Sequence, residues 1–524
     1  MDQPFAHIDQ LVAESLVKET KQRAFLQAMM AYARRGHSCI QVTDHIEPAL
    51  DCLGDIKDKE ILEKNLIEGA HSLPSQLIAH ISTTNERFNQ PIGKMGDLYY
   101  WQRNWVLETR VIQEMKRLLA EEVKPLDIEP TPELNKQQQQ ALVKGLRTKI
   151  FCLSGGPGTG KTFTMSHLVK NFLEKQKQCV VLSAPTGKAV SELKKGMRHI
   201  DPDQLQIGTL HALLKIRSFQ DSVHSITSLQ GGLIIVDECS MIDLALFGAL
   251  LKAVRKGSRL ILVGDADQLP PVESGNVFGE LCAFMHKHKR ENISHLDICM
   301  RSDRQDILFL AQQIKQGKWP SKTPREPFDL KRWKHLFPFP TSKKIDPSEH
   351  LKRLNKARIL SCVNEGPFGV QAINQGIWNH IRFLFRQGDQ WPIPIIASKT
   401  DYHLGVANGE MGIWLKYSNA PHIEENDILF FLGDQGQIRE IPAMLLRHFD
   451  IAYALSVHKS QGSEYETVIL VVPKGSEIFG REILYTGVSR ARTKLHIVGE
   501  YQTLKACSLL FLKKIPSLQI RLSI

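Results

Sequence analysis

The sequence has no long apolar run. Its longest apolar stretches, such as Leu233–Val236 and Val468–Val472, are far shorter than the run of about 18 residues that spans a bilayer. The N-terminus has no basic region followed by an apolar stretch, so no signal peptide is expected. We therefore expect a cytoplasmic protein without a membrane segment.

Paired cysteines are also missing. The nine cysteines stand singly, and no two of them form a C-x-x-C pair. This spacing argues against a zinc site or an iron–sulfur cluster built from neighbouring ligands. It is typical of a protein that keeps reduced thiols in the cytosol.

The composition is that of an ordinary soluble globular protein, with 42% hydrophobic and 23% charged residues. A chain of 524 residues is too long for one hydrophobic core, and its length suggests three or four domains. The formal net charge of +11 suits a polyanionic partner, because lysine and arginine bind phosphates and release counterions. The charge alone does not locate a binding face.

The periodicity of apolar residues changes along the chain. Up to about residue 125 the apolar spacing is mostly helical, and a proline-rich linker follows at residues 123–132. From Lys149 onward, short β-branched runs alternate with longer helical stretches, which is typical of strands buried in a parallel sheet. These runs are Lys149–Ser154, Val180–Ser183, Leu233–Val236 and Leu260–Val263.

A second set of such strands begins near Ile359 and resumes at Thr467–Val472 and Leu495–Val498. Between the two parts of this set, the chain from Trp391 to about Asp450 is rich in glycine, turns and short strands, and predicts a small all-β insertion. The predicted domains are residues 1–125, 126–290, 291–404 joined with 451–524, and an insertion at 405–450.

The strongest motif is the segment Gly155–Thr162, which reads GGPGTGKT. It matches the phosphate-binding pattern G-x-x-x-x-G-K-T and lies between a predicted strand and a predicted helix. Glycines let backbone N–H groups approach phosphates, while Lys161 reaches the β- and γ-phosphates and Thr162 binds Mg²⁺. The residues that would hold ATP here are Gly155, Gly156, Pro157, Gly158, Thr159, Gly160, Lys161 and Thr162.

Two further strands end in polar residues. Leu233–Val236 is followed by Asp237, a candidate metal ligand, and Glu238, a candidate general base for the attacking water. The other strand leads into Gly264–Val272, where Gln268 could sense the γ-phosphate. An ordinary strand followed by a Pro-Pro turn explains the spacing of that second segment equally well.

Together these segments carry a family resemblance. Gly155–Thr162, Ala184–Ala189, Asp237–Asp243, Gly264–Pro271, Asn408–Gly412, Val457–Glu464 and Tyr485–Arg492 resemble, in order, the motifs of superfamily 1 helicases of the RecD family. The resemblance covers residues ~134 to ~498. It implies an α/β fold with two RecA-like P-loop motor domains, a small SH3-like insertion and a mostly helical N-terminal domain. It also implies ATP and Mg²⁺ as cofactors.

The resemblance assigns roles at matching positions. Gln138 resembles the glutamine that reads adenine, although four glutamines in a row leave its register open. Arg301 and Arg490 resemble the two arginine fingers that stabilise charge on the γ-phosphoryl group. DNA contacts without base reading are implied for Thr186, Lys188, Thr209, His211, His458, Lys459 and Gln461. Both histidines fit a packed core nearly as well.

The N-terminal segments around Arg35–Ile40 and Leu98–Glu108 resemble those of RecD subunits that work in a heterotrimer with RecB-like and RecC-like chains. This resemblance implies a 5′→3′ motor on single-stranded DNA and duplex ends, acting in recombinational repair. A free-standing helicase and a DNA-dependent ATPase with a regulatory role stay open. We find no acid–lysine cluster typical of a nuclease, so any exonuclease activity is expected to belong to partner subunits.

Overall fold

The structure is a computed structural model that describes residues 6–50, 56, 58–83, 85–216, 226–298, 305–320, 338–354, 356–401, 403–433, 437–511 and 514–523. The chain divides into two compact units. The first comprises Met1–Pro185, Leu193–Met300 and Leu512–Ile524, and the second comprises Thr186–Glu192 and Arg301–Phe511.

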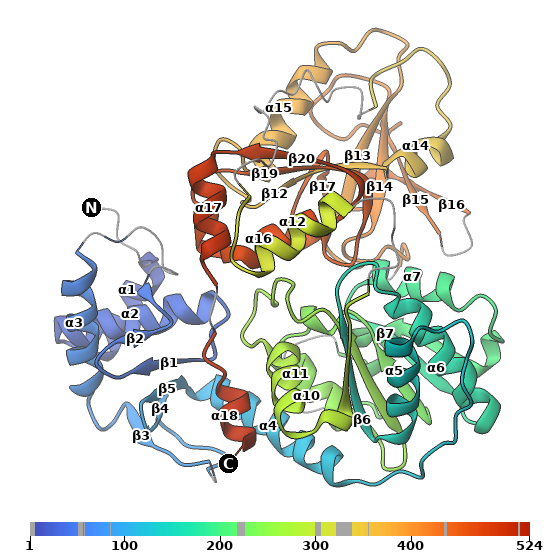
Figure 1. Ribbon diagram of the computed structural model, residues 1–524. Coiled ribbons are helices and arrows are strands. Elements are labelled where there is room, and N and C mark those ends of the chain that lie inside the picture. Colours follow the sequence, from blue (N-terminus) through green and yellow to red (C-terminus); the bar gives the residue numbers. More distant parts are fainter. Residues whose placement is uncertain are drawn as a thin grey trace. The chain divides into compact units, whose positions relative to one another are not determined.

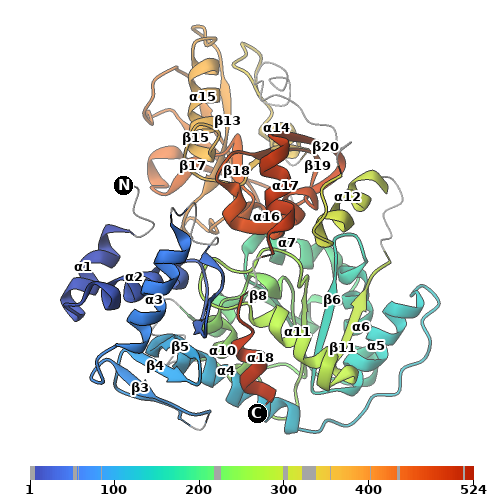
Figure 2. The same ribbon diagram turned by 60° about the vertical axis from the view of Figure 1, so that its left-hand side comes forward.

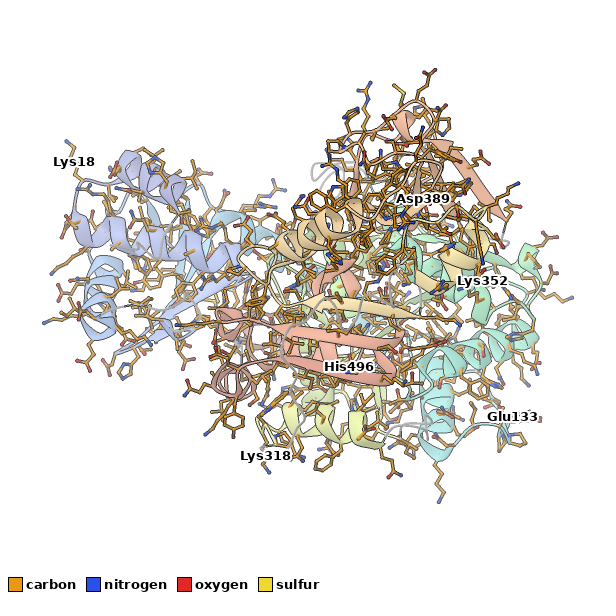
Figure 3. All side chains as sticks on the ribbon, turned by 90° about the horizontal axis from the view of Figure 1, so that it is seen from above. Lys18, Glu133, Lys318, Lys352, Asp389 and His496 are labelled. Carbon is orange, nitrogen blue, oxygen red and sulfur yellow. The ribbon has the colours of Figure 1, made fainter. Side chains whose placement is uncertain are left out.

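The N-terminal part of the first unit combines helices with a sheet (Figure 1). Its helices carry the apolar spacing that the sequence predicts, and Figure 3 shows Lys18, between α1 and α2, projecting away from them. The prediction of a mostly helical domain missed the five-stranded sheet of order β2-β1-β5-β4-β3, because strands of two to four residues show no readable period. The elements are α1 (His7–Leu16), α2 (Thr20–Arg34), β1 (Cys39–Val42), β2 (Ile46–Glu47), α3 (Lys59–His71), β3 (Ile78–His80), β4 (Ile92–Met95), β5 (Leu98–Trp101) and α4 (Gln102–Ala120).

A six-stranded parallel sheet of order β11-β6-β10-β9-β7-β8 forms the rest of the first unit. Figure 1 shows α10 and α11 on one side of this sheet and α5 and α6 on the other. The four predicted strands are confirmed, because fully buried strands give continuous apolar runs. The elements are α5 (Lys136–Arg147), β6 (Ile150–Gly155), α6 (Lys161–Lys175), β7 (Val180–Ala184), β8 (Leu205–Thr209), α8 (Leu210–Leu214), β9 (Leu233–Val236), α10 (Leu244–Ala253), β10 (Arg259–Gly264), α11 (Val277–His288) and β11 (Ile293–Leu296). Helix α7 (Gly187–Gly196) is divided between the units, because Thr186–Glu192 belongs to the second.

Two elements lie outside the predicted boundaries of the first motor domain. Strand β11 pairs with β6, so the boundary predicted at residue 290 cuts this sheet. Helix α18 (Ser517–Ser523), predicted in the second motor domain, packs against α4 and α11 in the first unit; Figures 1 and 2 both show it beside α4. A return over so long a sequence separation leaves no local signal.

The second unit holds a four-stranded parallel sheet of order β18-β12-β19-β20. Its strands include the predicted runs near Ile359, Thr467 and Leu495, and His496 on β20 is labelled in Figure 3. The prediction of an α/β fold with two parallel sheets is therefore confirmed. The elements are α12 (Gln305–Lys315), α14 (Pro347–Leu354), β12 (Ala357–Ser361), α15 (Val370–Arg382), β18 (Ala454–Ser456), β19 (Tyr465–Val472), α16 (Gly480–Val488), β20 (Ala491–Gly499) and α17 (Tyr501–Leu509).

The predicted insertion is an antiparallel sheet of order β16-β15-β14-β13-β17. It begins at β13, so the boundary at residue 405 cuts it. Just before β13, Asp389, labelled in Figure 3, accepts a hydrogen bond from the Arg386 backbone N–H (2.9 Å). The likeness of this sheet to an SH3 barrel stays a prediction. The strands are β13 (Trp391–Ala397), β14 (Met411–Lys416), β15 (Ile428–Leu432), β16 (Ile438–Pro442) and β17 (Phe449–Ile451).

Within the described residues, no helix is both long and apolar enough to cross a membrane.

Candidate functional site

Three neighbouring strands of the first sheet bring the predicted nucleotide residues to one edge. Strand β10 lies between β6 and β9 and is parallel to both, with Gly264 opposite Ser154 and Leu262 opposite Val236. The carboxyl ends of parallel strands meet at the same edge of a sheet. The loop after β6, the segment after β10 and the acidic pair after β9 therefore share one edge.

The loop after β6 has the shape of a phosphate cradle. Strand β6 ends at Gly155 and α6 begins at Lys161. Gly160 has φ +84°, and a Cβ there would lie 2.5 Å from Nε2 of Gln138, so only glycine fits. The Thr159 hydroxyl donates to the Gly156 carbonyl (2.8 Å). This ordered loop leads into a helix N-terminus, whose N–H groups suit phosphate.

The Lys161 side chain folds over this loop. Its Nζ donates to the carbonyl oxygens of Gly155 (2.7 Å) and Gly156 (3.1 Å). Thr162 follows in the first turn of α6 with an exposed side chain. A lysine charge added to the positive end of a helix makes this loop well suited to a polyphosphate.

The acidic pair lies at the end of β9. The Asp237 backbone N–H donates to the Ser183 carbonyl (2.9 Å), and Asp237 Oδ1 accepts from the Glu238 N–H (2.8 Å). Asp237 keeps part of its surface accessible, yet the surrounding protein desolvates it. Desolvation and then the charge of Glu238 raise the pKa of Asp237 to about 7, while nearby Lys161 lowers it. Two adjacent acids near a single lysine leave net negative charge at this edge, which suits a further cation.

Glu238 has a strained backbone. Its φ of +54° lies in the left-handed region, which costs a non-glycine residue on the order of 1 kcal/mol or more. The turn into the following 3₁₀ helix, Cys239–Met241, imposes this conformation. Strain of this kind persists where the fold must hold one side chain in a fixed direction.

Gln268 carries an unused acceptor. Its side chain is 5% exposed, and its Nε2 donates to Asp265 Oδ2 (3.0 Å). Its Oε1 is buried without a hydrogen-bond partner among the described residues. An oxygen acceptor can bind a water or an ammonium group, whereas a phosphate oxygen offers it no proton.

Gln138 is already engaged at the start of α5. Its side chain and that of Asn135 form a reciprocal capping box. In this box, Oε1 of Gln138 accepts from the Asn135 N–H (3.1 Å). Outside it, Nε2 of Gln138 donates to the Thr159 carbonyl (3.3 Å). The amide therefore braces the phosphate loop, and its role in reading adenine stays a prediction.

Two regions of the chain match known protein families. Residues 138–274 match the AAA domain, and residues 451–498 match the UvrD-like helicase C-terminal domain. Similar proteins include the RecBCD enzyme subunit RecD of Mycolicibacterium smegmatis (29% identical, covering 78% of this chain and 80% of the relative). The same subunit of Buchnera aphidicola is 25% identical over 84% of this chain and 86% of the relative. The chain is a RecD-like superfamily 1 helicase.

This RecD-like chain is an ATP-dependent DNA helicase. The ATP-dependent RecD2 DNA helicase of Deinococcus radiodurans is also similar, at 28% identity over 70% of this chain and 49% of the relative. Among solved structures, the Pif1 helicase of Candida albicans covers 72% of this chain and 96% of its own, at 18% identity and a TM-score of 0.43.

The predicted arginine fingers belong to the second motor domain. Arg301 lies outside the described residues. Arg490 is 3% exposed, and its guanidinium donates to the carbonyls of Thr486 (3.1 Å) and Ser463 (3.2 Å) and to Ser489 Oγ (3.0 Å). Arg490 is thus held inside the second unit in this conformation, and a finger role would require it to exchange these bonds.

Two predicted DNA-contacting threonines cap helices. Thr186 Oγ1 accepts from the Ala189 N–H (3.3 Å) at the start of α7, and Thr209 Oγ1 accepts from the Ala212 N–H (3.3 Å) at the start of α8. Capping explains both hydroxyls without DNA. The lysine between them in the predicted set, Lys188, has its Nζ 5.2 Å from the ring centre of Tyr465, and both residues belong to the second unit.

The remaining predicted DNA contacts differ in exposure. His211 is exposed. His458 contacts the Phe479 ring (centroids 5.8 Å apart), and burial lowers its pKa, which favours a packed neutral histidine. Lys459 is exposed and pairs with Asp450 (3.4 Å), while Gln461 is 8% exposed. His211 and Lys459 are therefore the more accessible candidates.

Asp265, whose carboxylate orients Gln268, is a residue of the site that was not predicted. A carboxylate that follows a strand directly and precedes the glutamine by three residues was an available signal. The strain at Glu238 had no sequence signal, because glutamate seldom adopts positive φ.

Proposed function

We propose that the chain is a 5′→3′ motor on single-stranded DNA and one subunit of a RecBCD-like complex that unwinds and processes duplex DNA ends in recombinational repair. The observation that carries this proposal is its similarity to proteins named RecD subunits along 78–89% of the chain. RecB-like and RecC-like chains would then be its partners.

In the proposed reaction, ATP binds on the loop Gly155–Thr162. Lys161 would leave the loop carbonyls and bind the β- and γ-phosphates, which are stronger acceptors. Glu238 would take the proton of the attacking water. Gln268 would accept a hydrogen bond from that water through its unused Oε1, rather than contact the γ-phosphate directly.

Mg²⁺ would be held by Thr162 and Asp237. The donor set fits, because hydroxyl and carboxylate oxygens are ligands that Mg²⁺ prefers, and Asp237 stands beside a second acid, Glu238, whose charge raises the pKa of Asp237. The ion held there would supply positive charge to the phosphates of ATP.

Arg490 and Arg301 would stabilise negative charge on the γ-phosphoryl group in the transition state. Movement along DNA additionally requires that the grip of each motor domain differ between the ATP-bound and hydrolysed states, because equal affinity shifts no equilibrium. The proposed DNA contacts are Thr186, Lys188, Thr209, His211, His458, Lys459 and Gln461. Backbone contacts of this kind carry no base specificity.

The test is strand separation by the purified chain with ATP and Mg²⁺, on duplexes with a 5′ or a 3′ single-stranded tail. Wherever this chain unwinds a duplex, alone or with its partners, we expect it to act on the 5′-tailed duplex only. Lys161→Ala is the inactive variant, and Lys170→Ala, an exposed lysine of the same helix, is the matched control. Unwinding of the 3′-tailed duplex alone would contradict the polarity.

A second candidate is a helicase that works without partners, and the similarity to the RecD2 helicase favours it. The same experiment separates the two candidates. Unwinding by the chain alone favours the free-standing helicase. ATPase stimulated by single-stranded DNA, with unwinding only after RecB-like and RecC-like chains are added, favours the subunit. ATPase without unwinding under either condition would point to the regulatory ATPase.

A further inference from the structure

The end of helix α2 forms a junction with the segment that follows Gln268. The helix closes in a Schellman motif, in which the His37 N–H donates to the Tyr32 carbonyl (3.1 Å) and the Gly36 N–H to the Ala33 carbonyl (3.0 Å). Gly36 occupies the left-handed position of this motif, with φ +78°. Its own carbonyl oxygen is left free to bind outside the helix.

That carbonyl accepts two hydrogen bonds from distant parts of the first unit. One comes from the Gly275 N–H (3.0 Å) and the other from Lys514 Nζ (3.0 Å). A Cβ on Gly36 would lie 3.0 Å from the Glu273 carbonyl oxygen and 3.2 Å from that of Val272. The N-terminal part and the loop Val272–Gly275 therefore touch backbone to backbone.

The loop Val272–Gly275 is closely linked to the nucleotide edge of the sheet. Three residues separate it from Gln268, of which Leu269 is 2% exposed and the other two are prolines, which fix φ and leave few soft torsions. The Ser274 carbonyl also accepts from the Leu244 N–H (3.2 Å) at the start of α10. A shift of this loop would therefore reach Gln268.

Lys514, the third member of the junction, is held in place by the residues that follow it. Beyond Lys514, Ser517 and Arg521 bind the buried Glu108 of α4 (2.6 and 3.0 Å). The backbone N–H groups of Leu518 and Gln519 donate to Glu280 of α11 (2.9 and 3.3 Å). These contacts fix Lys514 against both the N-terminal part and the first motor domain.

We propose that Gly36 is a positioning residue: its junction with Val272–Gly275 and Lys514 holds Gln268 in place, so that the N-terminal part of the chain sets the rate of ATP hydrolysis. This inference rests on the proposed role of Gln268 with the attacking water. Contacts far from the reacting atoms can have this effect, because displacements near 1 Å lower turnover by up to about a hundredfold.

The test compares Gly36→Ala with Gly96→Ala in the full chain. Both glycines lie in the N-terminal part with positive φ, but a Cβ at Gly96 would have nothing within 4 Å. Backbone strain is thus common to both variants, and only Gly36→Ala disturbs the junction. We expect kcat of the DNA-stimulated ATPase to fall about tenfold in Gly36→Ala, with KM for ATP within about twofold, and to stay within about twofold in Gly96→Ala.

Hydrogen exchange of peptides covering residues 265–277 gives a second readout that needs no activity. We expect faster exchange in Gly36→Ala and in Lys514→Met, which removes one donor at the junction, and unchanged exchange in Gly96→Ala. If Gly36→Ala fails to fold, Lys514→Met decides, with an expected fall in kcat of about threefold.

Equal kcat and equal exchange in Gly36→Ala and Gly96→Ala, or an unchanged Lys514→Met where Gly36→Ala does not fold, would overturn the positioning role and leave the proposed function intact. A wild-type chain without DNA-stimulated ATPase would instead contradict the proposed function, and with it the inference that rests on it.

Discussion

Two carboxyl groups of the first unit, Asp237 and Glu108, have raised pKa values for the same first reason, which is desolvation by the surrounding protein. Their neighbours differ. Glu108 binds the Arg521 guanidinium and the Ser517 hydroxyl. Asp237 has the acid Glu238 beside it and Lys161 nearby, and the unused acceptor of Gln268 lies in the segment after the neighbouring strand β10. Burial with a raised pKa therefore does not identify a catalytic site. The group beside each acid distinguishes the two: an acid for Asp237 and an arginine for Glu108.

The largest expected effect tests the Asp237 side of this comparison. Glu238→Gln should lower kcat of the ATPase about a thousandfold, because an amide cannot take the proton of the attacking water, while thermal stability stays near that of the wild type. Single-turnover ATP hydrolysis measures the effect. Glu291→Gln, whose acid is 80% exposed in the same unit, is the control, and a fall of less than about tenfold in Glu238→Gln would remove the general-base role.

The opposite result is expected on the Glu108 side. Arg521→Met should destabilise the first unit by about 3 kcal/mol, because it leaves Glu108 buried without its charged partner. Below the unfolding transition, kcat should fall by no more than the fall of about threefold expected for Lys514→Met. Thermal unfolding with ATPase at low temperature measures both. The double variant Glu108→Gln/Arg521→Met should recover most of the lost stability, and a large loss of kcat without a loss of stability would reverse the comparison.

Arg490 tests whether the surroundings of a buried residue reveal its role. By its surroundings it resembles Arg521, being 3% exposed and hydrogen-bonded, but its motif predicts an arginine finger. If the motif decides, Arg490→Ala should lower kcat about a hundredfold and leave ATP affinity nearly unchanged, as ATP binding and single turnover would measure. Arg492→Ala, which removes an exposed arginine paired with Glu464, is the control. Lost stability with normal turnover would make Arg490 a structural residue.

The smallest expected effect concerns His37, a buried group whose shifted pKa we attribute to structure and not to catalysis. Burial, then Lys514 and Arg35, lower the pKa of His37 to about 3 from its ordinary 6.5. The unfolded chain therefore binds this proton first, so stability is full above about pH 6.5 and is lost as the pH falls toward 3. From about pH 7.5 to about pH 5 the wild type should lose about 2 kcal/mol more than His37→Phe. Hydrogen exchange of N-terminal peptides measures this, and equal losses would contradict the shift.

The features that the sequence alone could predict are those whose contacts lie close together along the chain. The loop Gly155–Thr162 and the acids after β9 were predictable, because a motif and its flanking strands are local. Strand β11 was assigned to the wrong domain because its pairing partner β6 lies far from it in sequence. The strands β1–β5 were missed because two to four residues show no readable period. The strain at Glu238 and the acceptor of Gln268 are three-dimensional facts, and no residue pattern could state them.

The return of the chain after Phe511 to the first unit has a consequence for biosynthesis. A ribosome makes the second unit before it makes Ser517 and Arg521. The positions that these side chains occupy beside α4 therefore stay empty while about two hundred residues are synthesised. Until then Glu108 has neither of these partners. Domains usually fold as they are made. In this chain the first unit begins to fold before the second, but it is completed only after the second has been synthesised.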